Sequence, residues 1–333
     1  MPQTPDGKST RVDAPLTNVS VAYAQQNNYL ATRVFPEVSV QRQGDLYWKY
    51  NRGDWQRGQA ELRAPGTESS GGGWRVSTDS YYAHVYAVHK DLDDQTVQNA
   101  SNDFNLEADA TRWVTDQLMI KRDALWNSTY FKASLWTGGS EGHTLTKGNG
   151  FAGGWIAGAG TPILDIRNQR WAMREDTGYF PNTLVLGAQL YVDLLDHPDI
   201  IERVQYVERG IVGTDLLSAL FDGVKVIVAD NVASSGNLDA TVAPNHTETA
   251  LAYMSTKEDA LLCYAAPRAG LNEVSAGYTF AWTGLLGAGA MGARMKRFRM
   301  EEIESVRIEG EMAFALKVVA LDLGVYFDDV HTL

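Results

Sequence analysis

The sequence predicts an α+β fold, in which helices and strands are mixed without the regular alternation of a doubly wound sheet. Two observations support this prediction. The stretch "YYAHVYAVH", residues 81–89, alternates with a period of two, which is typical of a strand with two unlike faces. Residues 103–131 carry apolar residues at three- and four-residue spacings, which is typical of a long amphipathic helix.

Composition limits the class of protein. The chain has 333 residues, 44% of them hydrophobic and 10% aromatic, which indicates one large or two ordinary folded domains. The 29 basic and 41 acidic residues give a net charge of −12, which argues against a protein that holds nucleic acid mainly by neutralising phosphates. The single cysteine, Cys263, excludes an internal disulfide, and in its apolar surroundings we expect a buried small hydrophobe.

Neither a membrane span nor an export signal is expected. No apolar run is long enough to cross a bilayer. The N-terminal stretch "MPQTPDGKSTRVDAP" lacks the apolar core of a signal peptide and predicts a polar, mobile arm. Together with the single cysteine, this favours synthesis in a reducing cytoplasm.

The first third of the chain contains an unusual polar segment. Pro36 favours extended backbone before it, and "LYWKY" at 46–50 is strand-like. Residues 51–80 then show no apolar period and include three consecutive glycines. If this segment runs out and back, fifteen residues each way at about 3.3 Å per residue reach roughly 50 Å. Such a ribbon buries too little on its own chain to be stable alone, so we expect it to lie on another molecule.

The long helix is predicted over residues 103–131, a length of roughly 43 Å at about 1.5 Å per residue. Ser101, Asn102 or Asp103 is expected to cap its N-terminus. Its apolar stripe is predicted to contain Leu106, Ala110, Trp113, Val114, Leu118 and Leu125.

The remainder mixes loops, helices and strands. The glycine-rich residues 132–161 predict a long loop. Helices are expected at 162–178, 188–207 and 214–222, and strands at 182–187, 223–232, 259–267, 276–284 and twice within 305–327. The basic run at 294–299 is followed at once by glutamates, which indicates a solvated face of mixed charge.

Several patterns match catalytic or metal-binding signatures, but each lacks its required context. Ser140 lies in a G-x-S-x-G match without a helix after it, and residues 148–153 and 287–292 match G-x-G-x-x-G outside a βαβ unit. Residues 89–94 are rich in oxygen ligands but lack the glycine and closing glutamate of a calcium loop. We therefore predict no catalytic, cofactor-binding or metal-binding residues and no enzyme activity. The many carboxylates leave a carboxylate-based hydrolase as a remote alternative.

Nine segments in order carry a resemblance from about Val34 to Gly324. They are "VFPEVSV", "RAPGTESSGGGW", "NTLVLG", "HPDIIERVQY", "RGIVGTDLLSALF", "LLCYAAPRAGL", "SAGYTFAWTGLLGAG", "RFRME" and "RIEGEM…KVVALDLG". As a set they resemble the HK97-type major capsid proteins of tailed bacteriophages.

The resemblance implies an HK97-like capsid fold with an N-arm, an extended E-loop hairpin, a P-domain with a long spine helix, and an A-domain. The implied parts are an N-terminal arm at 1–45, an E-loop at 46–86, a P-domain at 87–178 with its spine helix at 103–131, an A-domain at 179–285, and C-terminal strands at 286–333 that complete the P-domain.

The resemblance also implies a function. A major capsid protein self-assembles into pentamers and hexamers that form the icosahedral head shell enclosing double-stranded DNA, which it contacts non-specifically. It is assembled in the cytoplasm of the bacterial host, becomes part of the virion, and works with a portal and in some cases a decoration protein. Because only a short arm precedes the E-loop, a separate scaffold protein is expected. An encapsulin-like shell around a protein cargo is the alternative.

Four E-loop residues are predicted to contact a neighbour's P-domain: Trp55, Arg57, Arg63 and Trp74, because Trp and Arg are enriched at interfaces. The type member of the family crosslinks an E-loop lysine to an asparagine of a neighbour. Residues 51–80 contain no lysine, and Lys49 and Lys90 lie outside them. We therefore expect no covalent crosslinking.

Overall fold

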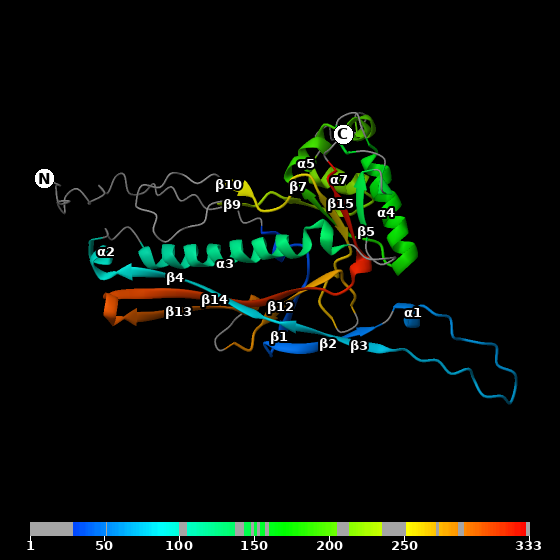
Figure 1. Ribbon diagram of the computed structural model, residues 1–333, viewed down its shortest axis with the longest axis horizontal. Coiled ribbons are helices and arrows are strands. Elements are labelled where there is room, and N and C mark those ends of the chain that lie inside the picture. The colour runs from blue at the N-terminus through cyan, green and yellow to red at the C-terminus, as the bar shows by residue number, and fades with distance from the viewer. Residues whose placement is uncertain are drawn as a thin grey trace.

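Two sheets and a projecting two-stranded ribbon organise the chain (Figure 1). The computed structural model describes residues 29–50, 52–99, 105–136, 143–147, 150–151, 154–156, 160–204, 213–234, 251–270, 273–285 and 290–330. Helices and strands are mixed along these residues without a βαβ repeat, which confirms the predicted α+β class.

The first sheet has five strands and is built around β14 (Ser305–Val318). On one side β14 pairs with β4 (His84–Asp93), and on the other with β12 (Gly277–Trp282) and then β13 (Ala293–Met300), all antiparallel. The short strand β1 (Glu37–Val40) adds to β12 in parallel. A strand of fourteen residues therefore holds together segments that are far apart in sequence.

One long helix, α3 (Leu106–Tyr130), lies along this sheet (Figure 1). Val114 and Leu118 pack against Met312 and Phe314 of β14. We call the five-stranded sheet and α3 together the α3 layer.

The predicted start of this helix is wrong by three residues. Asn105 caps it, since its side-chain oxygen accepts a hydrogen bond from the Ala108 amide at 3.1 Å. The three predicted caps at 101–103 lie outside the described residues.

The predicted burial of Trp113 is also wrong. The buried stripe follows Ala110, Val114 and Leu118 at four-residue steps, and Trp113 lies to one side of it with 44% of its surface exposed. Trp126, near the end of the helix, is fully buried instead.

The second sheet has six strands. Their order is β6 (Gly150–Phe151), β5 (His143–Lys147), β15 (Gly324–Asp328), β11 (Ala260–Cys263), β7 (Thr183–Gly187) and β8 (Lys225–Ala229). Helices α4 (Pro162–Thr177), α5 (Ala188–Leu195), α6 (Pro198–Val204) and α7 (Thr214–Leu220) contribute to one core with it. Cys263 is buried as predicted, and burial raises the pKa of its thiol to about 12.

Two sequence expectations differ from this sheet. The range 132–161, predicted to be a loop, contributes β5 and β6. The range 286–333 is divided, because β13 and β14 join the first sheet while β15 joins the second. Both differences arise from pairing between distant segments, which local composition does not report.

Short elements complete the chain. The α-helical turns are α1 (Arg52–Trp55) and α2 (Asp94–Asn99), and β9 (Val232–Ser234) pairs with β10 (Leu251–Tyr253). The 3-10 turns are η1 (Leu30–Thr32), η2 (Ala133–Leu135), η3 (Ala290–Gly292), η4 (Glu301–Ile303) and η5 (Leu321–Leu323).

A buried carboxylate ties three of these segments together. Asp123 of α3 accepts hydrogen bonds from the backbone amides of Leu30 at 3.0 Å and Ala31 at 2.9 Å, and from the side-chain amide of Asn231. Burial raises the pKa of Asp123 to about 6, against the opposing effect of these donors. The segment around Leu30 and Ala31 is therefore fixed to α3 and to the turn between β8 and β9.

Candidate functional site

The feature with the least support from its own chain is the ribbon, which we define as residues 44–82. Strands β2 (Gly44–Tyr50) and β3 (Val76–Tyr82) pair antiparallel, from Gly44 opposite Tyr82 to Tyr50 opposite Val76. Beyond them the chain continues outward as an extended loop, and the whole ribbon projects away from both sheets (Figure 1).

The ribbon leaves the α3 layer at one buried residue, Ala83. Its backbone amide donates to the Gln43 carbonyl at 2.7 Å, and the Gln43 side-chain amide donates to the Ala83 carbonyl at 3.0 Å. The alternating stretch 81–89, predicted to be one strand, is therefore two: β3 pairs with β2 before Ala83, and β4 pairs with β14 after it. The period of two continues across this change of partner, so the sequence pattern does not reveal the break.

Aromatic stacking fixes the base of the ribbon. The ring of Tyr81 stacks on Phe280 of β12 with centroids 4.6 Å apart and planes 8° apart, and Tyr47 lies 5.5 Å from the same ring. The Tyr47 hydroxyl donates to Asp79 at 2.9 Å across the two strands. The base of the ribbon is therefore held by an apolar contact, the stacking on Phe280, and by a polar contact, the hydrogen bond between Tyr47 and Asp79.

The middle of the ribbon carries a second aromatic cluster. Trp55 lies 5.7 Å from Tyr50 and 5.9 Å from Trp74, measured between ring centroids. The structure thus brings together two of the four predicted contact residues, and leaves both exposed, at 59% for Trp55 and 63% for Trp74. An aromatic pair of this kind presents a large apolar surface to solvent.

A salt bridge closes the ribbon beside this cluster. Asp54 accepts hydrogen bonds from the backbone amide and Nε of Arg75 at 3.0 Å and from its Nη2 at 3.2 Å. The Arg75 guanidinium lowers the pKa of the Asp54 carboxyl, and Arg57 lowers it further by its charge. Arg57, the third predicted residue, is exposed near this pair.

A hydrogen bond connects the middle of the ribbon to the six-stranded body. The side-chain amide of Gln56 donates to the Thr177 carbonyl at the end of α4, at 2.8 Å. Gly178 follows with φ +82°, in the left-handed region that ends helices, and a Cβ there would lie 2.8 Å from the Gln56 nitrogen.

The tip of the ribbon is a tight turn. The Thr67 amide donates to the Ala64 carbonyl at 3.2 Å, and Gly66 has φ +80°, as the third position of a type II turn requires. Arg63, the fourth predicted residue, donates from Nε to the Thr67 carbonyl at 2.5 Å. Arg63 therefore helps to shape the turn.

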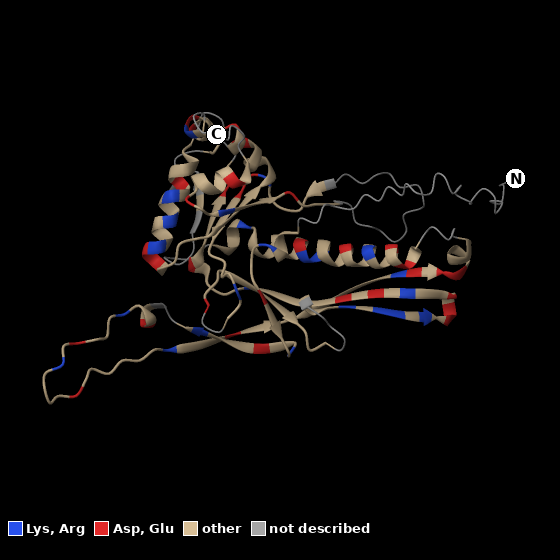
Figure 2. Cartoon of the chain, turned by 180° about the vertical axis from the view of Figure 1, so that it is seen from behind, with Lys and Arg blue, Asp and Glu red and all other residues tan. Residues whose placement is uncertain are grey.

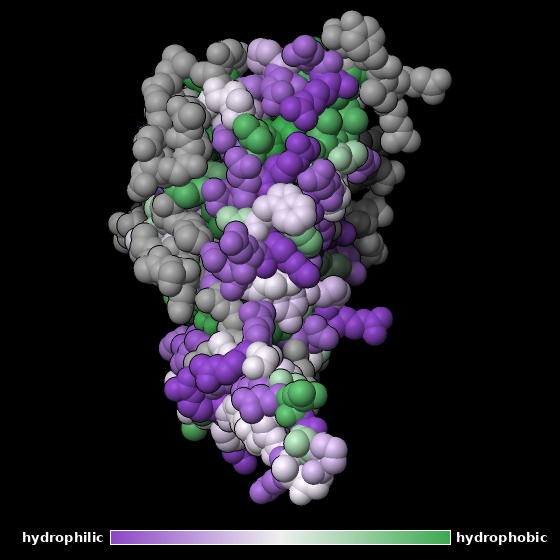
Figure 3. All heavy atoms as spheres, turned by 90° about the vertical axis from the view of Figure 1, so that its right-hand side faces the viewer, coloured by the Kyte–Doolittle hydropathy of each residue, from purple (hydrophilic) through white to green (hydrophobic). Residues whose placement is uncertain are grey.

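Sequence reasoning identified Trp55 and Trp74 but overlooked three other exposed apolar residues of the ribbon. Leu46, Trp48 and Leu62 are exposed, and Leu62 is exposed in full. The Pro-Gly pair at 65–66 predicts a turn, and it would have marked Leu62 as a residue near a tip. Figure 3 looks at this end of the molecule and shows a small hydrophobic spot within a mostly hydrophilic to neutral lower part.

Solved structures resemble this chain over nearly its whole length. A phage-related protein from Bordetella bronchiseptica RB50 aligns with a TM-score of 0.68 and 16% identity, covering 92% of this chain and 94% of that one. The capsid of the cyanophage P-SCSP1u aligns with a TM-score of 0.57 and 11% identity over 96% and 93% of the two chains. These similarities give the fold, which is that of HK97-type phage capsids.

Curated relatives agree in name with this fold. The major capsid protein of Burkholderia phage BcepMu is 23% identical over 221 residues, 66% of this chain and 69% of the relative. The major capsid protein of Pseudomonas phage JBD67 is 22% identical over 230 residues, 68% and 71% of the two chains. No family model matches the chain.

The chain is therefore similar in sequence to phage major capsid proteins and has the HK97-type capsid fold. Its relatives are structural proteins of the virion shell, as the sequence resemblance predicted.

The described part of this capsid protein contains no group of three or more His, Cys, Asp or Glu side chains that could hold a metal ion. No helix among these residues is long and apolar enough to cross a membrane. Ser140 and most of the two G-x-G-x-x-G matches lie outside the described residues.

The basic run of this capsid protein is neutralised on its own chain. It forms β13, as an exposed strand of mixed charge, and lysine and arginine lie beside aspartate and glutamate along this sheet (Figure 2). The ion pairs are Arg294–Glu311, Lys296–Glu309, Lys296–Glu311, Arg297–Glu107, Arg299–Asp94 and, on β14, Arg307–Asp91. Strand β13 therefore does not provide an unpaired basic face for phosphates.

Proposed function

We propose that this chain assembles through its ribbon into pentamers and hexamers, which form the icosahedral head shell enclosing the double-stranded DNA of a tailed phage or prophage. The observation that carries the proposal is the exposed aromatic surface of the ribbon, which no described part of its own chain covers. A two-stranded ribbon is marginal in water, and a neighbouring subunit would supply the missing contacts. The work of the protein is assembly and containment, without catalysis or a cofactor.

The parts of the fold are assigned accordingly. We propose the N-arm at 1–45, the E-loop at 46–86, the P-domain at 87–178 with α3 as its spine helix, the A-domain at 179–285, and C-terminal strands at 286–333. The antiparallel pair β2–β3 supports the E-loop assignment, and the packing of α3 on β4 and β14 supports the spine helix. Strand β15 lies in the six-stranded sheet, so the last range would contribute to both bodies.

The proposed contact surface centres on the Trp55–Trp74 pair, with Arg57 beside it, against the P-domain of a neighbour. Tryptophan and arginine are enriched at interface hot spots because they combine large apolar area with polar groups. Arg63 contributes indirectly, by holding the tip turn through its bond to Thr67.

The remaining partners follow from the same proposal. With a net charge of −12 and a paired β13, the chain would contact packaged DNA non-specifically and weakly. A portal, a scaffold protein and in some cases a decoration protein would take part, with assembly in the host cytoplasm before the virion forms. Covalent crosslinking through the ribbon is not expected, and denaturing gels of mature particles should show single chains.

A second function has one observation in its favour. The encapsulin SrpI from Synechococcus elongatus PCC 7942 aligns with a TM-score of 0.59 and 12% identity over 95% of this chain. An encapsulin-like shell would hold a protein cargo instead of DNA. The curated relatives are phage proteins, which favours the head shell. Particles that protect DNA from nuclease support the first function, and particles that co-purify with a stoichiometric protein cargo support the second.

Assembly itself is tested by size-exclusion chromatography and negative-stain microscopy of the purified chain. Rings, capsomers or megadalton shells are the expected products. A monodisperse monomer that stays inert with scaffold or crowding agent would overturn the proposal.

The ribbon is tested by deleting residues 60–73. The deleted chain should keep near-normal circular dichroism and no longer close shells, because its tip makes no contact that the two sheets need. Gly71→Ala is a matched control in the same segment, since a Cβ there has no atom within 4 Å, and it should assemble normally. Normal shells from the deletion would remove this role from the ribbon.

A further inference from the structure

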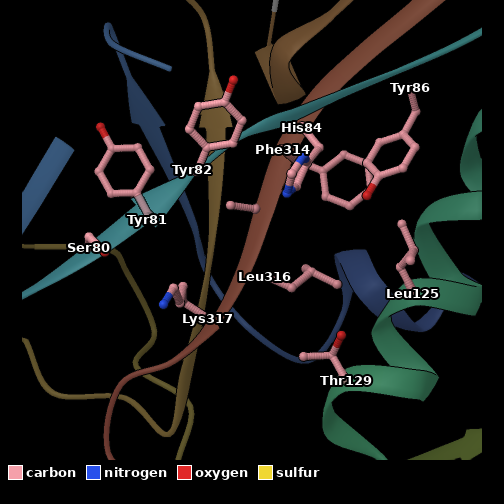
Figure 4. Close-up of a pocket in the computed structure, with 11 residues that line it drawn as sticks. Ser80, Tyr81, Tyr82, His84, Tyr86, Leu125, Thr129, Phe314, Leu316 and Lys317 are labelled. Carbon is pink, nitrogen blue, oxygen red and sulfur yellow. The ribbon is translucent and has the colours of Figure 1, made fainter. Parts of the chain in front are cut away.

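A pocket of about 330 Å³ lies where the ribbon joins the α3 layer. Figure 4 shows its lining: Tyr82 and His84 beside the junction, Tyr86 and Phe314 on the sheet, Leu125 on α3, and Lys317 at the far side. Aromatic and aliphatic side chains form part of the walls, polar atoms make up the larger share of the exposed lining, and the Lys317 ammonium is among them. This chemistry suits an apolar side chain with a carboxylate next to it.

The tip of the ribbon offers such a group. Leu62 is exposed in full and follows Glu61, which is also exposed. The type II turn after them is closed by the Thr67 amide and by Arg63, so the tip is already ordered before it meets a partner. An ordered tip loses little conformational entropy on docking.

We propose that Leu62 of one copy enters this pocket on a second copy, with Glu61 beside Lys317. The inference rests on the proposed role of the ribbon in assembly, and it names the site that receives the tip. The pocket volume is large enough for a leucine side chain together with part of the turn. Lys317 Nζ lies 3.9 Å from Asp79 Oδ1, a long contact that leaves the ammonium able to bind a second carboxylate.

The occupant is a second copy because the chain cannot fill its own pocket. The pocket lies at the base of the ribbon, whereas Leu62 lies two residues before the turn at 64–67 that forms its tip. Each copy thus carries Leu62, which we call the knob, and the pocket that would receive it, which we call the socket, at different places. Such a contact is heterologous, and repeated by a rotation that closes, it gives a ring.

The first test crosslinks knob and socket. Leu62→Cys is combined with Thr129→Cys, which replaces a half-buried pocket residue of α3, and assembled particles are treated with a short bismaleimide. A ladder of covalent oligomers on denaturing gels is expected. The control pairs Leu62→Cys with Val97→Cys, which is exposed on α2 far from the pocket, and should give single chains. Cys263 is buried and does not react. A ladder from the control and not from the test pair would overturn the proposal.

The second test removes the apolar fit. Leu62→Asp and the socket-filling Thr129→Trp should each lower the assembled fraction by about tenfold or more at a subunit concentration near the wild-type threshold, because a buried leucine contact is lost. Leu62→Met keeps the volume and should assemble as the wild type. Circular dichroism of the two Leu62 variants should match the wild type, since Leu62 is exposed in full.

Different outcomes test the assembly role of the ribbon and the pocket as its docking site. If the 60–73 deletion still closes shells, the assembly role of the ribbon fails. If the deletion abolishes shells while Leu62→Asp assembles normally and the cysteine pair gives no ladder, the ribbon keeps its role and the pocket is not its docking site.

Discussion

The α3 layer and the ribbon are both long and both carry aromatic and charged residues, yet they differ in how those residues are used. In the α3 layer, a core of apolar side chains such as Val114 and Phe314 is buried between the helix and β14, and arginines such as Arg297 and Arg299 pair with acids of the same chain. In the ribbon, Trp48, Trp55 and Trp74 remain exposed although two of them touch each other.

This difference in the exposure of apolar groups shows which surface has its binding groups satisfied within its own chain. A surface with buried apolar groups and internal ion pairs has most of its binding groups satisfied within its own chain. A surface that exposes large aromatic side chains on an ordered frame has its binding groups arranged before the partner arrives. The following predictions test this contrast, from the largest expected effect to the smallest.

Removing one tryptophan from each region should have opposite consequences. Trp126→Ala, at a fully buried site, should lower the free energy of unfolding of the unassembled subunit by about 3–5 kcal/mol. Trp74→Ala should change it by less than about 0.5 kcal/mol and lower shell yield. Denaturant unfolding and electron microscopy measure the two effects. A large loss of subunit stability in Trp74→Ala would break the contrast.

Adding one methyl group should also separate the regions. A Cβ on Gly310 of β14 would lie 2.9 Å from Met295 Sδ and 3.0 Å from Leu118 Cδ1, so Gly310→Ala should destabilise the subunit by about 1–3 kcal/mol. Gly73→Ala in the ribbon meets no atom within 4 Å and should be neutral. Thermal unfolding of both variants checks this, and equal stabilities would contradict the packing of α3 on β14.

The two regions should respond to pH with opposite sign. Asp123 in the α3 layer has its pKa raised to about 6, so the folded state binds a proton before the unfolded state does. Its contribution to the free energy of unfolding should therefore rise by about 1 kcal/mol between pH 7 and 5, as linkage requires. Asp54 in the ribbon has a lowered pKa, so its contribution is present above its ordinary pKa and is lost at lower pH.

Asp123→Asn isolates the first effect. The difference in unfolding free energy between the wild type and Asp123→Asn, measured by denaturant at several pH values, should shift in favour of the wild type as the pH falls from 7 to 5. A flat difference would show that burial does not govern this carboxyl.

The smallest effect is expected at the ion pairs of the α3 layer. Arg299→Ala removes an exposed pair with Asp94, at 2.6 Å, and should destabilise the subunit less than Gly310→Ala does. High salt should shrink this difference, because exposed charges are screened. Unfolding at low and high salt provides the measurement, and a salt-independent loss would indicate a packing role for the arginine stem.

Local patterns predicted much of the fold. Residues 103–131 became α3 at Leu106–Tyr130, and the expected strands at 182–187, 259–267 and 276–284 are β7, β11 and β12. The polarity of 51–80 correctly marked a segment with little support of its own. Each of these features depends on residues that are neighbours in sequence.

The failures have a shared cause. Nothing local distinguishes β3 from β4 across Ala83, because the alternation continues while the pairing partner changes. Strand β5 was hidden in a glycine-rich range because it is defined by β15, far along the chain. Trp113 was misplaced because a helical stripe has edges that spacing alone does not locate. The socket for Leu62 combines β3, β4, α3 and β14, so it exists only once those pairings are made.

The hydrogen bond from Gln56 to Thr177 has a mechanical consequence. The ribbon is clamped at its base, where Tyr81 stacks on Phe280, and it is propped part-way along its length by this one amide. A ribbon attached both at its base and part-way along its length bends less easily than a ribbon attached only at its base. A load applied at the tip is thus passed in part through the Gln56 side chain into α4 and the six-stranded body, and this contact adds to the stiffness of the projection.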